Sequence, residues 1–181
     1  MATLATCLAT AGLLLSATSA LVFAAGAPIE GAFGIQLGAS YTVEEKPFFQ
    51  FQSLIVVRRP PAPNDRFLLY TIRIVPSSKV VASIEGMSDV LDSATCRARY
   101  FEVKSVLEEK YGSLSPSADE SGSGILAVSK TLGDRNVKLE CSCDLPTNRC
   151  SLAIRYTDAL LESAAVREDQ EADKKKAKSG L

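Results

Sequence analysis

The chain has 181 residues, 46% of them hydrophobic, which is enough for one domain to bury a core without a metal ion or a partner. Its 20 Lys and Arg residues nearly balance 21 Asp and Glu residues, and this argues against the basic excess of a nucleic-acid-binding surface. Histidine is absent, which excludes histidine-dependent triads, His-ligated zinc sites and histidine acid–base catalysis.

The first 27 residues carry no charged side chain. An apolar run followed by small residues is typical of a secretory signal peptide, and we expect cleavage between Ala24 and Gly26. We therefore assign residues 1–26 to a signal peptide and residues 27–181 to a single mature domain, periplasmic or secreted and not stably inserted in a membrane. The alternative is an uncleaved anchor, since about 20 apolar residues span a bilayer.

The first half of the mature chain is predicted to be rich in β-strands. A short edge strand at residues 33–38 precedes a strong strand at residues 48–57, which the prolines of residues 58–65 end because proline cannot donate to a central ladder. Two more strands are expected at residues 67–75 and 79–84. A helix capped by Asp92 or Ser93 follows and runs to Tyr111, where Gly112 ends it.

The second half repeats this order after a Ser- and Gly-rich loop. Strands are predicted at residues 125–131, 137–143 and 150–156, and a charged C-terminal helix at residues 158–178 whose end lies in solvent. The order strand-strand-strand-helix, twice, indicates an α+β fold with an antiparallel β-sheet, helices on one face and disulfide staples.

Removal of the leader takes away Cys7 and leaves four cysteines, which imply two disulfides in an exported chain. Strand alternation places Cys141 and Cys143 on one face, and Cys150 on the apolar face of the following strand. Pairing these strands as a hairpin sets Cys143 opposite Cys150. We therefore predict the bridge Cys143–Cys150, with Cys141 joining the sheet to Cys96 on the helix.

A thiolate metal site or a redox pair is the functional alternative for these cysteines. Cys141-Ser-Cys143 has C-x-C rather than C-x-x-C spacing, and neither a second such motif nor a histidine accompanies it. We therefore expect structural disulfides, no metal and no other cofactor.

Several short segments are shared with a known group of proteins. They are Phe33-Gly-Ile-Gln-Leu-Gly38, the proline-interrupted strand pair, the helix that ends Leu107-Glu-Glu-Lys-Tyr-Gly112 with a cysteine at its start, and the cysteine-bearing terminal hairpin. On these features the chain resembles small exported bacterial proteins without an assigned activity. The resemblance implies compartment and fold and says nothing about chemistry.

Two sequence features could suggest a nucleotide-binding or a catalytic site, but neither is specific. Ser121-Gly-Ser-Gly124 lacks the Gly-Lys-Ser/Thr ending of a phosphate loop and precedes a predicted strand, so we interpret it as a connector. The adjacent acids Glu44-Glu45 and Asp119-Glu120 would serve a glycosidase only if two carboxyl groups faced each other across a cleft. We assign no catalytic, cofactor-binding or metal-binding residue.

Arg58, Arg59 and Arg66 flank the proline-rich loop. Arginines and prolines on a loop held by a rigid hairpin are typical of a recognition surface, although a solvated loop tip would have the same composition. We therefore expect an exported, non-catalytic interaction module for an unknown protein or envelope partner. The alternative is a carboxylate-dependent hydrolase acting on cell-envelope polymers.

Overall fold

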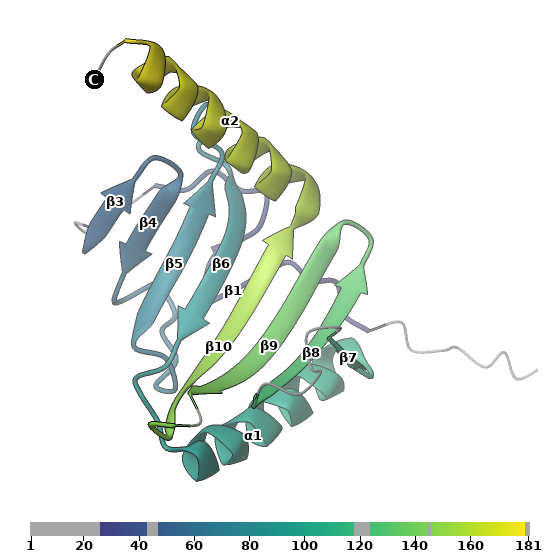
Figure 1. Cartoon of the computed structure of the whole chain (residues 1–181). Coiled ribbons are helices and arrows are strands. Elements are labelled where there is room, and N and C mark those ends of the chain that lie inside the picture. The colour runs from purple at the N-terminus through teal and green to yellow at the C-terminus, as the bar shows by residue number, and fades with distance from the viewer. Residues whose placement is uncertain (1–25, 43–46, 118–123, 145, 180–181) are drawn as a thin grey trace, which may run out of the picture.

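The centre of the fold is an antiparallel eight-stranded sheet with the order β3-β4-β5-β6-β10-β9-β8-β7 (Figure 1). The structure is a computed structural model that describes residues 26–42, 47–117, 124–144 and 146–179. The strands of the sheet are β3 (Phe49–Phe51), β4 (Leu54–Val57), β5 (Leu69–Ile74), β6 (Val81–Met87), β7 (Ser115–Pro116), β8 (Ile125–Leu132), β9 (Arg135–Asp144) and β10 (Arg149–Asp158). A separate N-terminal ribbon pairs β1 (Gly31–Ala32) with β2 (Ile35–Gln36), and the helices are α1 (Ser93–Tyr111) and α2 (Ala159–Lys178).

The α+β class and the antiparallel sheet confirm the prediction, but the element order strand-strand-strand-helix is wrong. Each half contributes four strands to the eight-stranded sheet before its helix, and the ribbon β1–β2 precedes the first half. The strand predicted over residues 48–57 is a hairpin in which Phe51 pairs with Leu54. Its turn depends on Gln52, which adopts a left-handed φ of 48°. Glycine, asparagine and aspartate are the residues that usually signal this conformation, so no local residue pattern marks the turn.

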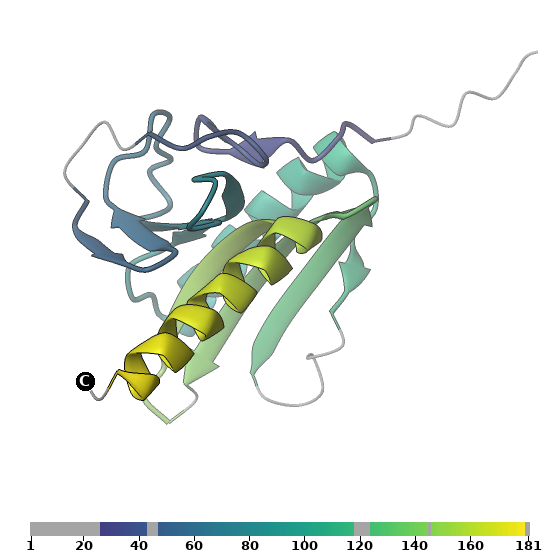
Figure 2. The ribbon, with the colours of Figure 1, turned by 90° about the horizontal axis from the view of Figure 1, so that it is seen from above.

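The prediction that both helices lie on one face of the sheet is also wrong. Figure 2 shows α2 on one side of the sheet, with α1 and the N-terminal segment on the other. Cys96 and Leu107 of α1 belong to the main core, whereas Ala165 of α2 packs with Val75 and Ala82 in a second, smaller core. The physical reason lies in β6, where four consecutive residues, Val81 to Ile84, are buried, so that this strand is covered on both faces.

Each helix packs mainly on the half of the sheet that the other half of the sequence forms. β6 and β10, the last strands of the two halves, pair at its centre. The helix α1 follows β6 but contacts β8, β9 and β10, whereas α2 follows β10 and contacts β5 and β6. The N-terminal segment covers the first half on the α1 side, where Ile29, Ile35 and Leu37 are buried in the main core.

Both helices begin at an aspartate cap, and Asp92 is one of the two caps predicted for α1. The Asp92 carboxylate accepts from the Thr95 N–H at 2.9 Å, and Asp158 accepts from the Leu161 N–H at 3.2 Å. Gly112, with φ 78°, ends α1. Among the described residues, no helix combines the length and the hydropathy needed to cross a bilayer.

Both predicted disulfides are confirmed. Cys143 faces Cys150 in the β9–β10 register, and their Cα atoms lie 4.0 Å apart. Cys96 of α1 is bonded to Cys141 of β9. The sulfur atoms of Cys96, Cys141 and Cys143 lie within 4.8 Å of one another, which would also suit a metal. A disulfide sulfur is not a thiolate, however, so the bonded form offers no such ligand set.

Candidate binding groove

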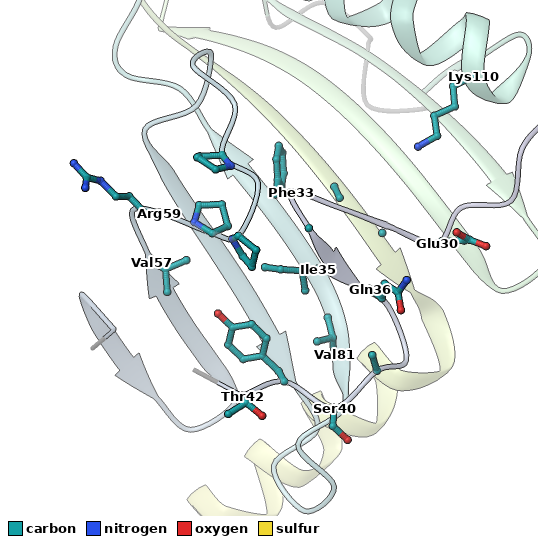
Figure 3. Close-up of a pocket in the computed structure, with 18 residues that line it drawn as sticks. Glu30, Phe33, Ile35, Gln36, Ser40, Thr42, Val57, Arg59, Val81 and Lys110 are labelled. Carbon is teal, nitrogen blue, oxygen red and sulfur yellow. The ribbon is translucent and has the colours of Figure 1, made fainter. Parts of the chain in front are cut away.

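A groove of about 980 Å³ opens between the N-terminal ribbon and the proline-rich loop that follows β4 (Figure 3). The ribbon and the segment after it contribute residues 30–36 and 39–42, and the loop contributes Arg59, Pro60, Pro61 and Pro63. Val57 and Val81, both buried, contribute apolar surface from the sheet, and Lys110 reaches the groove from α1. The groove therefore combines polar and apolar lining surface with charged groups from separate elements.

The ribbon is held in place by the aromatic ring at its turn. Phe33 packs edge-on against Tyr70, with ring centroids 4.8 Å apart, and against Phe67 at 5.6 Å. Gly34, with φ 77°, follows at the turn, and a Cβ there would lie 2.9 Å from the Cβ of Pro61. Only glycine lets the ribbon approach the proline-rich loop this closely. The Ala62 N–H then donates to the Phe33 carbonyl at 3.0 Å, which joins the two walls.

The proline-rich loop is fixed from below by Tyr70. The Tyr70 hydroxyl donates to the Asn64 carbonyl at 2.8 Å and accepts from the Asn64 N–H at 2.9 Å. The Asn64 side chain in turn accepts from the Arg66 N–H at 3.0 Å. Because prolines fix their own φ angles as well, the loop loses little conformational entropy when a ligand binds.

The three arginines predicted to bind a partner lie in different surroundings. Arg59 lines the groove and forms no ion pair with a described residue. The guanidinium of Arg58 lies 4.6 Å from the ring centroid of Phe48. Arg66 reaches Glu102 on α1 at 3.4 Å. The structure therefore brings only Arg59 to the groove, and the role of the three arginines in recognition stays a prediction.

Sequence reasoning missed the other charged groups of the groove. Lys110 lies at the end of the groove opposite Arg59, and Glu30 lies on the same side as Lys110 (Figure 3). Lys110 belongs to the segment read only as a helix end, and Glu30 precedes a segment read only as a strand. No local signal marks either residue, because the fold alone brings them together.

The remaining sequence candidates do not form a catalytic centre in the described part of the chain. Glu30 is the one acidic residue among those lining the groove. The acids Glu44, Glu45, Asp119 and Glu120, and residues 121–123, lie outside the described residues. Gly124 is followed by the strand β8, as expected for a connector rather than a phosphate loop. The predicted leader also lies outside the description, apart from Gly26.

Tyr156 lies close to the ring that anchors the ribbon, and Tyr111 is its neighbour. The ring of Tyr156 faces that of Phe33, with centroids 6.5 Å apart. Burial, together with the neighbouring Tyr111, raises the pKa of the Tyr156 hydroxyl well above its ordinary value of 10.0. Both residues are almost fully buried, so they contribute to the core and neutral Tyr156 adds no charge to the groove.

Comparisons with known protein families, with curated protein sequences and with solved structures returned no significant match.

Proposed function

We propose that the chain is an exported, non-catalytic binding module whose groove accepts an extended segment of a partner protein. The observation that carries this proposal is the groove itself. Its two walls are the N-terminal ribbon and the proline-rich loop, and both are held in place by contacts with the rest of the fold. Pre-formed apolar clefts with a few convergent polar groups are the usual form of binding sites. Arg59 and Lys110 at opposite ends favour a ligand with apolar residues at its centre and acidic residues toward its ends.

The disulfides support the export part of the proposal. Disulfides form and persist in oxidising compartments, and they are rare where thiols are kept reduced. All four cysteines of residues 27–181 are bonded in pairs. We therefore propose a periplasmic or secreted location.

The hydrolase alternative finds less support in the geometry. A glycosidase places two carboxyl groups about 5–9.5 Å apart on either side of the scissile bond. Glu30 is the single acid that the described residues bring to the groove. A binding role needs no second acid, which is why the groove favours it.

A peptide-display selection on the purified mature protein tests the proposal. We expect enrichment of linear peptides that have an apolar centre and flanking acids. The affinity of a selected peptide should fall at least roughly tenfold in Arg59→Glu, since the substitution reverses a charge at the groove. Arg58→Glu is the matched control, because Arg58 is adjacent in sequence but lies against Phe48.

Two outcomes would contradict this function. One is that no linear peptide is enriched over an unrelated disulfide-bonded protein. The other is that the enriched peptides bind Arg59→Glu as tightly as they bind the unsubstituted protein.

A further inference from the structure

Three phenylalanines on and beside the edge strand β3 are exposed to solvent. Phe48, Phe49 and Phe51 are 63%, 55% and 51% exposed. A single exposed apolar residue is unremarkable, but three within four positions on a sheet edge mark an interaction surface. Figure 1 shows β3 at the end of the sheet, and none of the described strands pairs with its outer side.

The rings gather at one edge of the sheet. Phe51 and Phe49 pair with Leu54 and Val56 and thus share the face of the sheet on which α2 lies. Phe48 lies one residue before the strand, and its N–H donates to the Val56 carbonyl at 2.9 Å. The edge therefore presents three exposed aromatic rings within four consecutive residues.

Cations lie directly over the aromatic rings. Arg58 lies 4.6 Å from the ring centroid of Phe48, and the Nζ of Lys176 lies 5.5 Å from that of Phe51. Lys176 belongs to the end of α2, which also carries Lys174, Lys175 and Lys178. This combination of Phe48, Phe49, Phe51, Arg58 and Lys176 is called the basic aromatic edge below.

Two acids of α2 lie at this edge and accept hydrogen bonds from neutral side chains of the turn between β3 and β4. Residues 47–59 contain two arginines and no acid. On α2, the Asp173 carboxylate accepts from the Gln52 side chain at 2.7 Å, and Asp169 accepts from the Ser53 hydroxyl. Arg58 and the four lysines of residues 174–178 outnumber the three acids of residues 169–173, so among the described residues this edge is basic, on a chain whose formal net charge is -1.

We infer that the basic aromatic edge docks on an anionic phospholipid surface, in addition to and independently of any ligand in the groove. Apolar rings that enter the headgroup region, with cations beside the lipid phosphates, are the combination that binds peripheral proteins to such surfaces. At that depth the outer backbone groups of β3 stay hydrated. A second copy of the chain fits less well, because pairing two β3 strands would bring one basic edge against another.

Vesicle co-sedimentation of the mature protein tests this inference, with phosphatidylcholine vesicles compared against equimolar phosphatidylcholine and phosphatidylglycerol vesicles. We expect binding to the anionic vesicles alone, weakened by added salt because salt screens the charges. The double variant Phe49→Ser/Phe51→Ser should lose at least roughly tenfold in affinity, and Lys176→Gln about fivefold.

Phe101→Ser is the matched control. Phe101 is 52% exposed, as the edge phenylalanines are, but it lies on α1. Its substitution should leave vesicle binding unchanged, and circular dichroism of every variant checks folding. Equal binding of the edge variants and the unsubstituted protein, or no binding to anionic vesicles at low salt, would overturn the inference. A dimer in sedimentation equilibrium that the edge substitutions abolish would instead assign the edge to a second copy.

Discussion

The two halves of the sheet share one order of elements but are stabilised differently. The second half has strands β9 and β10 of 10 residues each, and both disulfides attach to it. In the first half, β3 and β4 have 3 and 4 residues, and no described disulfide reaches them. The groove and the basic aromatic edge both belong to the first half. The comparison suggests a division of roles, in which the disulfide-bonded half serves as a scaffold and the other half presents the two surfaces that we propose to bind.

The helices show the same contrast. On the second half, α1 buries Cys96, Tyr100 and Leu107 against an apolar face. On the first half, Ala165 is the one buried residue of α2 within its described range. The remaining attachment is partly ionic, through Arg73 to Glu162 at 3.4 Å. The helix α2 therefore buries fewer side chains than α1 and depends more on polar contacts, so we expect it to be held less firmly.

Removal of the long-range disulfide should have the largest effect. The Cys96–Cys141 bridge closes a separation of 45 residues, and Cys143–Cys150 closes one of 7. On the chain-entropy estimate, Cys96→Ala/Cys141→Ala lowers the free energy of unfolding by about 4 kcal/mol and Cys143→Ala/Cys150→Ala by about 2.5 kcal/mol. Urea denaturation measures both. Losses near zero for both pairs would mean that the second half does not depend on its staples.

A methyl group on Gly86 should disturb the first half. A Cβ at Gly86 would lie 2.9 Å from the Cζ of Phe33, which anchors the ribbon beside the groove. We expect Gly86→Ala to cost about 1–3 kcal/mol, as overpacking does, and to weaken peptide binding. Adding Phe33→Leu should recover part of the stability, because the two substitutions are coupled through one contact. Strict additivity in urea denaturation would show that the contact does not restrain the ribbon.

The smallest expected effect is a loss of stability at alkaline pH. It arises from Tyr156 on β10, the strand that pairs with β6 where the two halves of the sheet meet. The raised pKa of buried Tyr156 keeps its proton in the folded state, whereas the unfolded chain releases it near pH 10. The contribution is therefore fully present below pH 10 and is lost above it, by up to about 1.4 kcal/mol per pH unit. Urea denaturation between pH 9 and 11 should show a shallower decline for Tyr156→Phe. Equal slopes would contradict the burial of this hydroxyl.

Local regularity explains which parts of the fold could be predicted. The β9–β10 hairpin was predicted with its register, because its strands alternate cleanly and the cysteines fix the pairing. The β3–β4 hairpin was missed because Gln52 turns the chain without a turn-forming residue. The groove could not have been predicted, since Phe33, Arg59 and Lys110 come from three elements that only the tertiary fold brings together.

The central claim is that the chain is exported and that two disulfides hold its second half together. The intact mass of the protein isolated from cells, measured before and after reduction, tests this claim most directly. The account predicts a chain that lacks a leader ending between Ala24 and Gly26. It also predicts that reduction adds the mass of four hydrogen atoms, two for each of the bridges Cys96–Cys141 and Cys143–Cys150. A full-length chain with no change on reduction would contradict it, and would make Cys96, Cys141 and Cys143 candidate thiolate ligands for a metal.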